Sequence, residues 1–569
     1  GDQSFTIRAT QLTNSGSIGI AEDASNPPAV DPTTGQATSS NTETPATDTG
    51  NTSNPEAGTP PITTNPVVLK AGHITANNTL SNSGSIATSG ALTVNASDAV
   101  NNSGAIRTAA PLVIQTRTLN NTTTGSIKSQ SNVNITATTA VHNQGSLQAQ
   151  NLTITAPTID NNQGNLTGEQ VLNLNASGQI TNVEGSIAGK ALHLNTPQLD
   201  NTKGSISTSS DLTLDNAHLD NSTGSISARN LILNNRTLAN TDGQLLASEG
   251  LTSTADSIIN SNGTIAAGTT LTVNASSNIN NDKGLLQGKT TDITTTSLTN
   301  TNNLNTGGII GQEILNVTTT GDINNQSGLI AGNTSVVNAA QINNTKGSLQ
   351  SAKTLTVKTV TLNNTKGNVS SQDKLTLTAT RLINNNGNVA TAANLALNVN
   401  QINNATGTII ANQNAQIQSD QLNNDAGGLI QANNLSITAA QLSNKDSGTT
   451  GGIIATKALD VTVSGNINNV KGYIGGGTAT LQAAHLDNAQ GQVNSNNGLN
   501  ITAGALNNSG GILGSAATVS LSTVSLNNSK GNISSSQGNV NLKTNALIND
   551  GGQIIANAST ALAAKTISN

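Results

Sequence analysis

The sequence predicts an all-β protein, a right-handed parallel β-helix of about 25 coils with ~20 residues and three short strands per coil. Three observations predict this fold. An aliphatic-x-Asn triplet recurs 26 times along 569 residues. Aliphatic residues alternate with polar ones over short stretches between those triplets. Large aromatic side chains, which fill most globular cores, are almost absent.

The asparagine that ends each triplet is the most regular position of the repeat. In a stacked architecture, one such residue per coil would form a column with ~4.8 Å between rungs. Asn amides at that spacing can hydrogen-bond to one another as a ladder. The residues predicted to form this structural ladder are Asn82, Asn102, Asn121, Asn201, Asn221, Asn344, Asn364, Asn384, Asn404, Asn424, Asn508 and Asn528.

Strands and turns follow from the residues between the triplets. Leu355 and Val357 alternate with Thr356 and Lys358, which is the period of a strand with one buried face. A glycine follows each asparagine within a few residues, and we expect it to occupy a corner where φ is positive. The predicted turn glycines are Gly204, Gly224, Gly347, Gly367, Gly387, Gly407 and Gly531.

Composition excludes several classes of function. Phe5 and Tyr473 are the only aromatic residues, and Cys, Met and Trp are absent, so there is no disulfide framework or thiolate metal site. The net charge of −6 comes from residues 21–66, which contain acidic residues but no Lys or Arg. The other charges balance and are scattered singly, with no basic stripe and no stacking aromatics for nucleic acid. We therefore predict no nucleic-acid partner.

The chain divides into three predicted parts. Residues 1–20 form a first coil, and residues 67–569 form a continuous β-helix. Between them, residues 21–66 are acidic and rich in Pro and Thr, so we predict a flexible insertion into one coil. Its role stays open between a tolerated insertion and a displayed recognition or processing loop.

A longer period lies above the coil. The coils that begin at Asn300 and Asn444 are each five residues longer than usual, and both contain Thr-Gly-Gly-Ile-Ile. Their starts are 144 residues, or seven coils, apart. We infer a duplicated seven-coil block with copies at about 161–300, 300–444 and 444–569. Such duplication lengthens a rod without building a new site.

No residue pattern predicts chemistry. His73, His142, His193, His218 and His485 stand apart from one another. Asp200 and Asp220 occupy equivalent places in adjacent coils, as do Lys346 and Lys366, and we interpret both pairs as solvated. A carboxylate pair acting on a sugar is the alternative for the aspartates. We predict no catalytic residues, no metal site, no cofactor and no small-molecule substrate, so the chain is not expected to be an enzyme.

The repeat resembles that of a known family. Leu-Asn-Asn-Thr-Lys-Gly-Asn-Val at 362–369, Leu-Asp-Asn-Ser-Thr-Gly-Ser-Ile at 219–226 and Leu-Asn-Asn-Ser-Lys-Gly-Asn-Ile at 526–533 resemble the repeats of filamentous haemagglutinins. That family comprises large exoproteins of two-partner secretion in Gram-negative bacteria, both adhesins and contact-dependent growth inhibition effectors. The chain resembles their central shaft.

The resemblance implies a location, partners and a function. The protein would be secreted to the outer-membrane cell surface through an outer-membrane secretion partner, and would be a monomer. We expect a rigid, non-catalytic shaft that presents a distal binding or toxin domain to a receptor on target or host cells. The alternative is that the shaft surface or the 21–66 loop is itself an adhesin. A polysaccharide-acting enzyme is a distant alternative.

Overall fold

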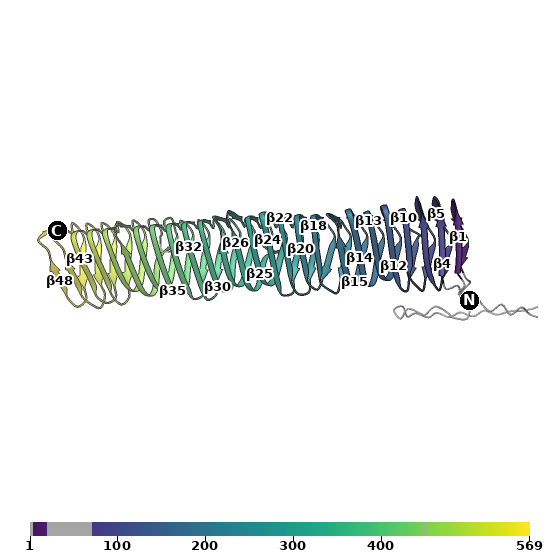
Figure 1. Cartoon of the computed structure of the whole chain (residues 1–569). Coiled ribbons are helices and arrows are strands. Elements are labelled where there is room, and N and C mark those ends of the chain that lie inside the picture. The colour runs from purple at the N-terminus through teal and green to yellow at the C-terminus, as the bar shows by residue number, and fades with distance from the viewer. Residues whose placement is uncertain (1–3, 20–70, 449) are drawn as a thin grey trace, which may run out of the picture. The chain divides into compact units, whose positions relative to one another are not determined.

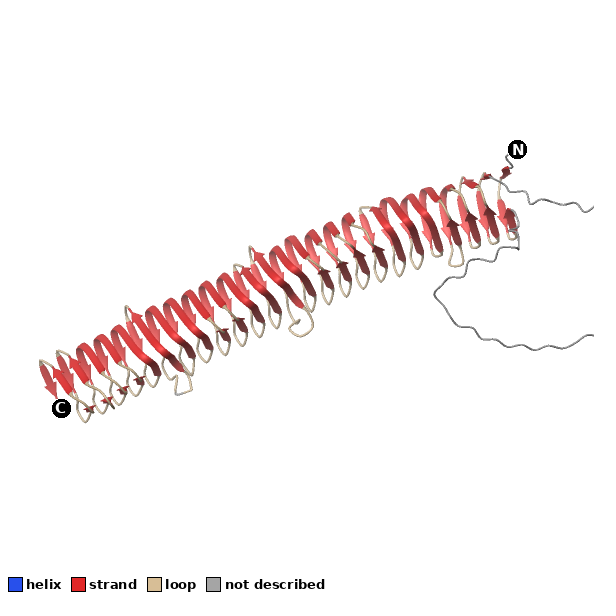
Figure 2. Cartoon of the chain, turned by 90° about the horizontal axis from the view of Figure 1, so that it is seen from below, coloured by secondary structure: helices blue, strands red, loops and turns tan. Residues whose placement is uncertain are grey.

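In the computed structural model, which describes residues 4–19, 71–448 and 450–569, every regular element is a β-strand and no described residue is helical. The chain separates into two compact units, residues 1–156 and 157–569, each of which is a stack of parallel strands (Figures 1 and 2). Together they contain about 25 turns that repeat every ~20 residues. The predicted parallel β-helix is therefore confirmed, and its right-handed sense stays a prediction.

The strands that begin in the first unit are β1 (Ser4–Ala9), β2 (Leu12–Asn14), β3 (Ser17–Gly19), β4 (Ala71–Ala76), β5 (Thr79–Asn82), β6 (Ser85–Thr88), β7 (Ala91–Ala96), β8 (Ala99–Asn102), β9 (Ala105–Thr108), β10 (Leu112–Asn121), β11 (Ser126–Ser129), β12 (Asn132–Asn143) and β13 (Ser146–Asp160).

The strands of the second unit are β14 (Asn165–Thr181), β15 (Ser186–Asn195), β16 (Gln198–Asp200), β17 (Ser205–Thr208), β18 (Leu212–Asp220), β19 (Ser225–Ala228), β20 (Leu231–Ala239), β21 (Gln244–Ala247), β22 (Leu251–Ile259), β23 (Thr264–Ala267), β24 (Thr270–Asn280), β25 (Leu285–Thr299), β26 (Gly308–Thr319), β27 (Asp322–Asn324), β28 (Leu329–Asn338), β29 (Gln341–Asn343), β30 (Ser348–Asn363), β31 (Asn368–Ser371), β32 (Lys374–Ile383), β33 (Asn388–Thr391), β34 (Asn394–Asn403), β35 (Thr408–Asn423), β36 (Leu429–Ser443), β37 (Gly452–Val463), β38 (Asn466–Asn468), β39 (Tyr473–Asp487), β40 (Gln492–Ser495), β41 (Leu499–Asn507), β42 (Ile512–Ser515), β43 (Val519–Asn527), β44 (Asn532–Ser535), β45 (Val540–Lys543), β46 (Ala546–Ile548), β47 (Gln553–Ala556), β48 (Thr560–Ala563) and β49 (Thr566–Ser568).

Each turn contributes three strand segments to three parallel stacks. In the turn from Asn364 to Asn384, β31 pairs with β33, and β32 pairs with β34 over 374–379 and again over 381–383. Residues paired across neighbouring turns are 20 apart here, as in Leu375 with Leu395. The third segment leads directly into the next ladder asparagine, so every turn closes at the same edge.

The core is a narrow aliphatic column, as the composition requires. In this same turn the inward residues Val369, Leu375, Leu377 and Leu382 are all 0% exposed. They alternate with outward polar residues because successive side chains of a strand point to opposite faces. One turn has too few such residues to fold alone, so the stack depends on contacts with the turns above and below.

The first unit contains the predicted insertion point. Strands β1, β2 and β3 pair in register with β4, β5 and β6, so residues 4–19 form one turn stacked on residues 71–88. In the next turn only Ser89 and Gly90 separate β6 from β7. Residues 20–70 therefore stand where two residues suffice elsewhere. The predicted 21–66 insertion itself lies outside the described residues.

Candidate functional site

The most regular feature of the structure is a hydrogen-bonded column of buried asparagines at the closing edge of each turn. In the second unit each asparagine of this column, from Asn161 to Asn549, donates from Nδ2 to Oδ1 of the next column asparagine, over 2.6–2.8 Å. All amides of the unit point the same way. Chains of aligned hydrogen bonds polarise one another, which strengthens each bond in a buried setting.

Each amide also fixes the turns on either side of it. Asn344 Nδ2 donates to Asn364 Oδ1 at 2.7 Å, to the carbonyl of Gly347 in its own turn at 3.2 Å and to the carbonyl of Asn368 in the next turn at 3.0 Å. The side chain is 0% exposed. A buried amide left without partners would cost about 1–3 kcal/mol, so the column is stable only when complete.

The first unit has its own column. Asn14, Asn82, Asn102 and Asn121 each donate to the following asparagine over 2.7–2.8 Å, and Asn121 donates to Asn143. Asn14 and Asn82 are 68 residues apart in the chain yet bond like any other neighbours. The twelve asparagines assigned to the ladder from sequence lie in these two columns, each no more than 1% exposed.

The turn glycines lie where we expected them, but for a different reason. Positive φ belongs to the residue before each of them, with φ between 52° and 59° at Lys203, Thr223, Lys346, Lys366, Asn386, Thr406 and Lys530. The seven predicted glycines do not have positive φ. The expectation that these glycines supply the left-handed corner is therefore wrong.

Close approach between turns explains the glycines instead. A Cβ built on Gly367 would lie 2.1 Å from the backbone oxygen of Asn344 and 2.5 Å from Oδ1 of Asn364. Contacts of nearly the same length recur at Gly204, Gly224, Gly347, Gly387, Gly407 and Gly531. Only a residue without Cβ lets the asparagine column and the backbone of the preceding turn come this close.

Each of the two longer turns contains a buried polar side chain that the sequence did not indicate. Asn303 is 0% exposed, accepts a bond from the Leu329 amide at 2.9 Å and donates to Asn300 Oδ1 at 2.7 Å and to the Asn281 carbonyl at 3.1 Å. Ser447, which is 144 residues further on, is 1% exposed and accepts from the Tyr473 amide at 3.0 Å. In ordinary turns a glycine carbonyl fills this place, as Gly347 does for the Asn368 amide at 2.9 Å.

The ionisable residues singled out from the sequence lie in turns and at the surface. Asp200 and Asp220 are in register, and each accepts a bond from the backbone amide two residues on, at 2.9 Å. Among the described residues, no three His, Cys, Asp or Glu side chains are grouped to hold a metal ion. No helix within the described ranges is long and apolar enough to span a membrane.

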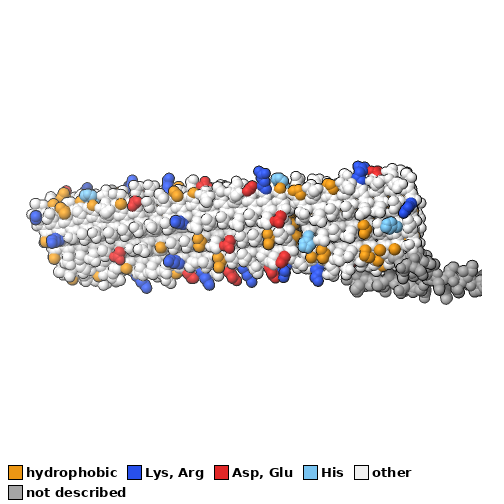
Figure 3. All heavy atoms as spheres, viewed as in Figure 1, with side chains coloured by type: hydrophobic (Ala, Val, Ile, Leu, Met, Phe, Trp, Pro, Cys, Tyr) orange, Lys and Arg blue, Asp and Glu red, His pale blue; other side chains and the backbone are white. Residues whose placement is uncertain are grey.

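Electrostatic effects are local and confined to the surface. Hydrogen bonds from Asn230 and then Arg229 lower the pKa of Asp211, and bonds from Gln163 and Lys203 lower the pKa of Glu184. All six side chains hold neighbouring turns together from the outside. On the face shown in Figure 3, positive and negative side chains are interspersed among uncharged ones, without a patch of one sign.

Comparison with known proteins places the repeat in a family. The model described as haemagglutinin repeat matches residues 33–151, 142–184, 185–255, 237–327, 315–379, 367–470, 430–490, 474–539 and 524–569. Searches of curated proteins and of solved structures found no match. The matched repeats run from residue 33 to residue 569 and contain every asparagine of the two columns except Asn14, and the chain therefore belongs to the haemagglutinin-repeat family.

Proposed function

We propose that residues 157–569 act as a rigid shaft that holds a distal binding or toxin domain away from the producing cell. The observation that carries this proposal is the unbroken asparagine column from Asn161 to Asn569. Asn344, for example, bonds to a carbonyl of its own turn and to a side chain and a carbonyl of the next turn. Bending between two turns would therefore break buried hydrogen bonds. A repeated structure of this kind resists bending and sets a length.

Duplication supports the same function. The long turns at 300–308 and 444–452 differ in sequence, but in both a buried polar side chain at the equivalent position accepts a bond from a backbone amide of the next turn. A block copied with its packing intact extends the stack by seven turns, or about 34 Å at ~4.8 Å per turn. Length is then the property that duplication changes.

We further propose that the protein is a surface exoprotein of a Gram-negative bacterium, exported by two-partner secretion through an outer-membrane partner. Membership of the haemagglutinin-repeat family supports an adhesin-like surface protein. Delivery of a toxin in contact-dependent growth inhibition and attachment to host cells are the two branches of this proposal. In both, the shaft works as a monomer and its receptor is recognised by another part of the protein.

A deletion tests the shaft. Removing residues 300–443 joins Thr299 to Asn444 and keeps the ladder in register, because Asn444 takes the place of Asn300. Electron microscopy of the purified protein should show a particle shorter by about 34 Å, and target binding by the parent protein should persist. A matched deletion of 300–433 removes half a turn too little and should misfold. Loss of target binding with the fold retained would contradict the shaft and favour adhesion through its lateral surface.

A further inference from the structure

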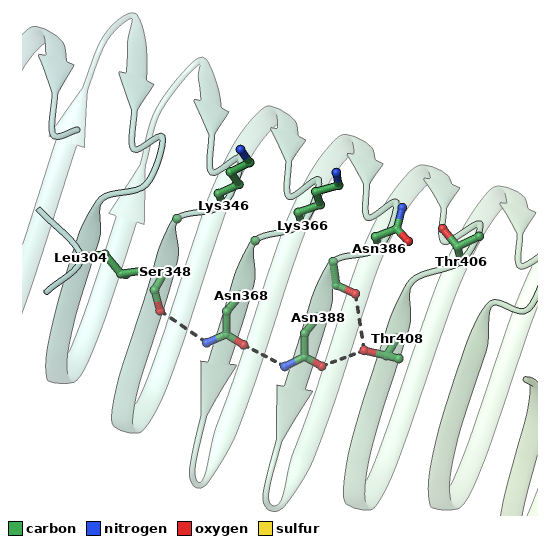
Figure 4. Close-up of a pocket in the computed structure, with 12 residues that line it drawn as sticks. Leu304, Lys346, Ser348, Lys366, Asn368, Asn386, Asn388, Thr406 and Thr408 are labelled. Atoms are coloured by element: carbon green, nitrogen blue, oxygen red, sulfur yellow. Dashed lines mark hydrogen bonds between the residues drawn. The ribbon is translucent and has the colours of Figure 1, made fainter. Parts of the chain in front are cut away.

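A groove runs along the closing edge of the second unit where four successive 20-residue turns begin at Asn344, Asn364, Asn384 and Asn404. Its volume is about 490 Å³. The floor is the backbone of Gly347, Gly367 and Gly387, which lack side chains because of the close approach described above. Figure 4 shows the groove and the side chains that border it.

One wall is a continuous row of hydrogen-bonded polar side chains. Thr408 Oγ1 donates to Asn388 Oδ1 at 2.8 Å, Asn388 Nδ2 donates to Asn368 Oδ1 at 2.8 Å, and Asn368 Nδ2 donates to Ser348 Oγ at 3.4 Å (Figure 4). The row holds these groups at the spacing of the turns. Asn388 Nδ2 keeps a second N–H for which the described residues supply no acceptor.

The opposite rim is formed by the residues with positive φ. Lys346, Lys366, Asn386 and Thr406 follow one another along it, and the two lysines extend away from the polar row in Figure 4. Neither ammonium group has an ion-pair partner among the described residues, and no carboxylate lines the groove. A lysine ammonium on a flexible four-carbon stem can turn over the groove towards an anion.

Both ends of the groove are marked by irregular turns. Leu304, from the long turn at 300–308, is 39% exposed and lines one end. Beyond the other end, the corner after Asn424 has one residue more than the corner after Asn404, and Gly427 in it has φ 83°. The groove is therefore a bounded segment of about four rungs rather than a feature of the whole edge.

The duplicated block provides an internal comparison. In the block at 444–569, ladder asparagines and floor glycines recur 144 residues later at the first three of these turns, and the fourth asparagine follows at Asn549, but the borders differ. Gln490 and Gly510 replace Lys346 and Lys366, and Ile512 replaces Asn368. Ile512 is 36% exposed and interrupts the polar row. The block at 300–444 thus combines two unpaired lysines with an unbroken polar row, and its copy at 444–569 does not.

We propose that this groove binds a short segment of a linear, 1,4-linked polysaccharide whose rings carry carboxylates. Pyranose rings carry hydroxyl groups around their whole edge, so each ring that lies over the groove presents a hydroxyl group to the polar row even though successive rings are rotated about the chain axis. The carboxylates meet Lys346 and Lys366, and the C–H face of a terminal ring packs on Leu304. An extended peptide repeats its side chains on one face every ~6.7 Å, which does not match the ~4.8 Å rungs.

Binding of oligogalacturonate to the full chain, measured by calorimetry at low and physiological salt, tests the groove. The variant K346Q/K366G/N368I carries the residues found in the 444–569 block. We therefore expect the fold to tolerate them, and circular dichroism checks this. We expect the variant to bind about tenfold more weakly. The matched control, K457Q/K471Q, removes two lysines of the 444–569 block and should bind like the wild type.

Four results would overturn the proposal. They are binding no tighter than that of neutral dextran, equal binding by the groove variant, binding of dextran sulfate but not of oligogalacturonate, and equally groove-dependent binding of polyglutamate. If the triple variant unfolds, K346Q/K366Q keeps the backbone preferences of a long side chain and serves in its place. These experiments measure oligogalacturonate binding by the whole chain, whereas the 300–443 deletion, which also removes the groove, tests the shaft through particle length, so failure of one proposal is distinguished from failure of the other.

Discussion

Asn364 in one seven-turn block and Asn508 in the next make the same contacts. Each donates to the asparagine of the following turn at 2.7 Å, and each is 0% exposed. The residues on the rim beside them differ, since Lys366 corresponds to Gly510 and Asn368 to Ile512. The comparison teaches that contacts between turns constrain the inner edge, whereas the rim, which faces solvent, is free to vary.

The largest effect should come from the floor glycines, equally in both blocks. Gly367→Ala and Gly511→Ala each place a Cβ 2.1–2.2 Å from a backbone oxygen of the preceding turn. We expect each to destabilise its region by more than about 3 kcal/mol, because the backbone itself must move. Urea unfolding with hydrogen exchange on the flanking turns measures this. Gly510→Ala is the control for the added volume, since its nearest neighbour is a side-chain carbon at 3.6 Å, and its φ of 63° should limit the loss to about 1–2 kcal/mol.

The ladder asparagines should come next. Asn364→Ala removes the donor to Asn384 Oδ1 and one of the three acceptors of Asn344 Nδ2 in a buried column. We expect a loss of about 3 kcal/mol, seen as faster hydrogen exchange in the turns on either side, with no change in any binding activity. Asn508→Ala should behave alike. A loss of binding at unchanged stability would show that the column is a functional site.

The long turns should separate the two blocks. Asn303 donates to three oxygens and accepts one bond, whereas the Ser447 hydroxyl accepts one bond, from the Tyr473 amide. Asn303→Ala should therefore cost about 2–3 kcal/mol and Ser447→Ala about 1 kcal/mol. Thermal unfolding of the two variants gives the comparison. Equal losses would mean that the side chains do not replace the missing glycine carbonyl.

The smallest effect is expected on the rim. Lys366→Gly removes a Cβ from a residue with φ of 56°, a conformation that costs an ordinary residue about 1–2 kcal/mol. The gain is offset by the greater freedom of glycine in the unfolded chain, so stability should stay within about 1 kcal/mol of the wild type or rise. Lys374→Gly, in β32, is the matched control and should destabilise by about 0.5–1 kcal/mol. Equal losses in the two variants would refute the assignment of strain to Lys366.

The repeat made the fold and the column predictable. Few folds can accommodate a polar residue that recurs at a constant interval among alternating aliphatic residues. Stacked turns can, because each buried amide then finds a hydrogen-bond partner in the next turn. Leu362, Asn364 and Val369 could be assigned to the interior from this pattern, and all three are 0% exposed. The candidate groove was not foreseen, because its residues come from four turns and none is unusual within its own turn.

By itself, the sequence determined the period, the inward residues and the asparagine column, because these depend on spacing along the chain. The tertiary structure decided why the corners look as they do. The positive φ falls on Lys366 rather than Gly367, since Gly367 must leave room for the Asn344 carbonyl of the turn before. Asn303 is buried for a similar reason, as its partners Asn281 and Leu329 belong to the turns on either side. Contacts between residues more than twenty positions apart set these choices, and a local pattern does not contain them.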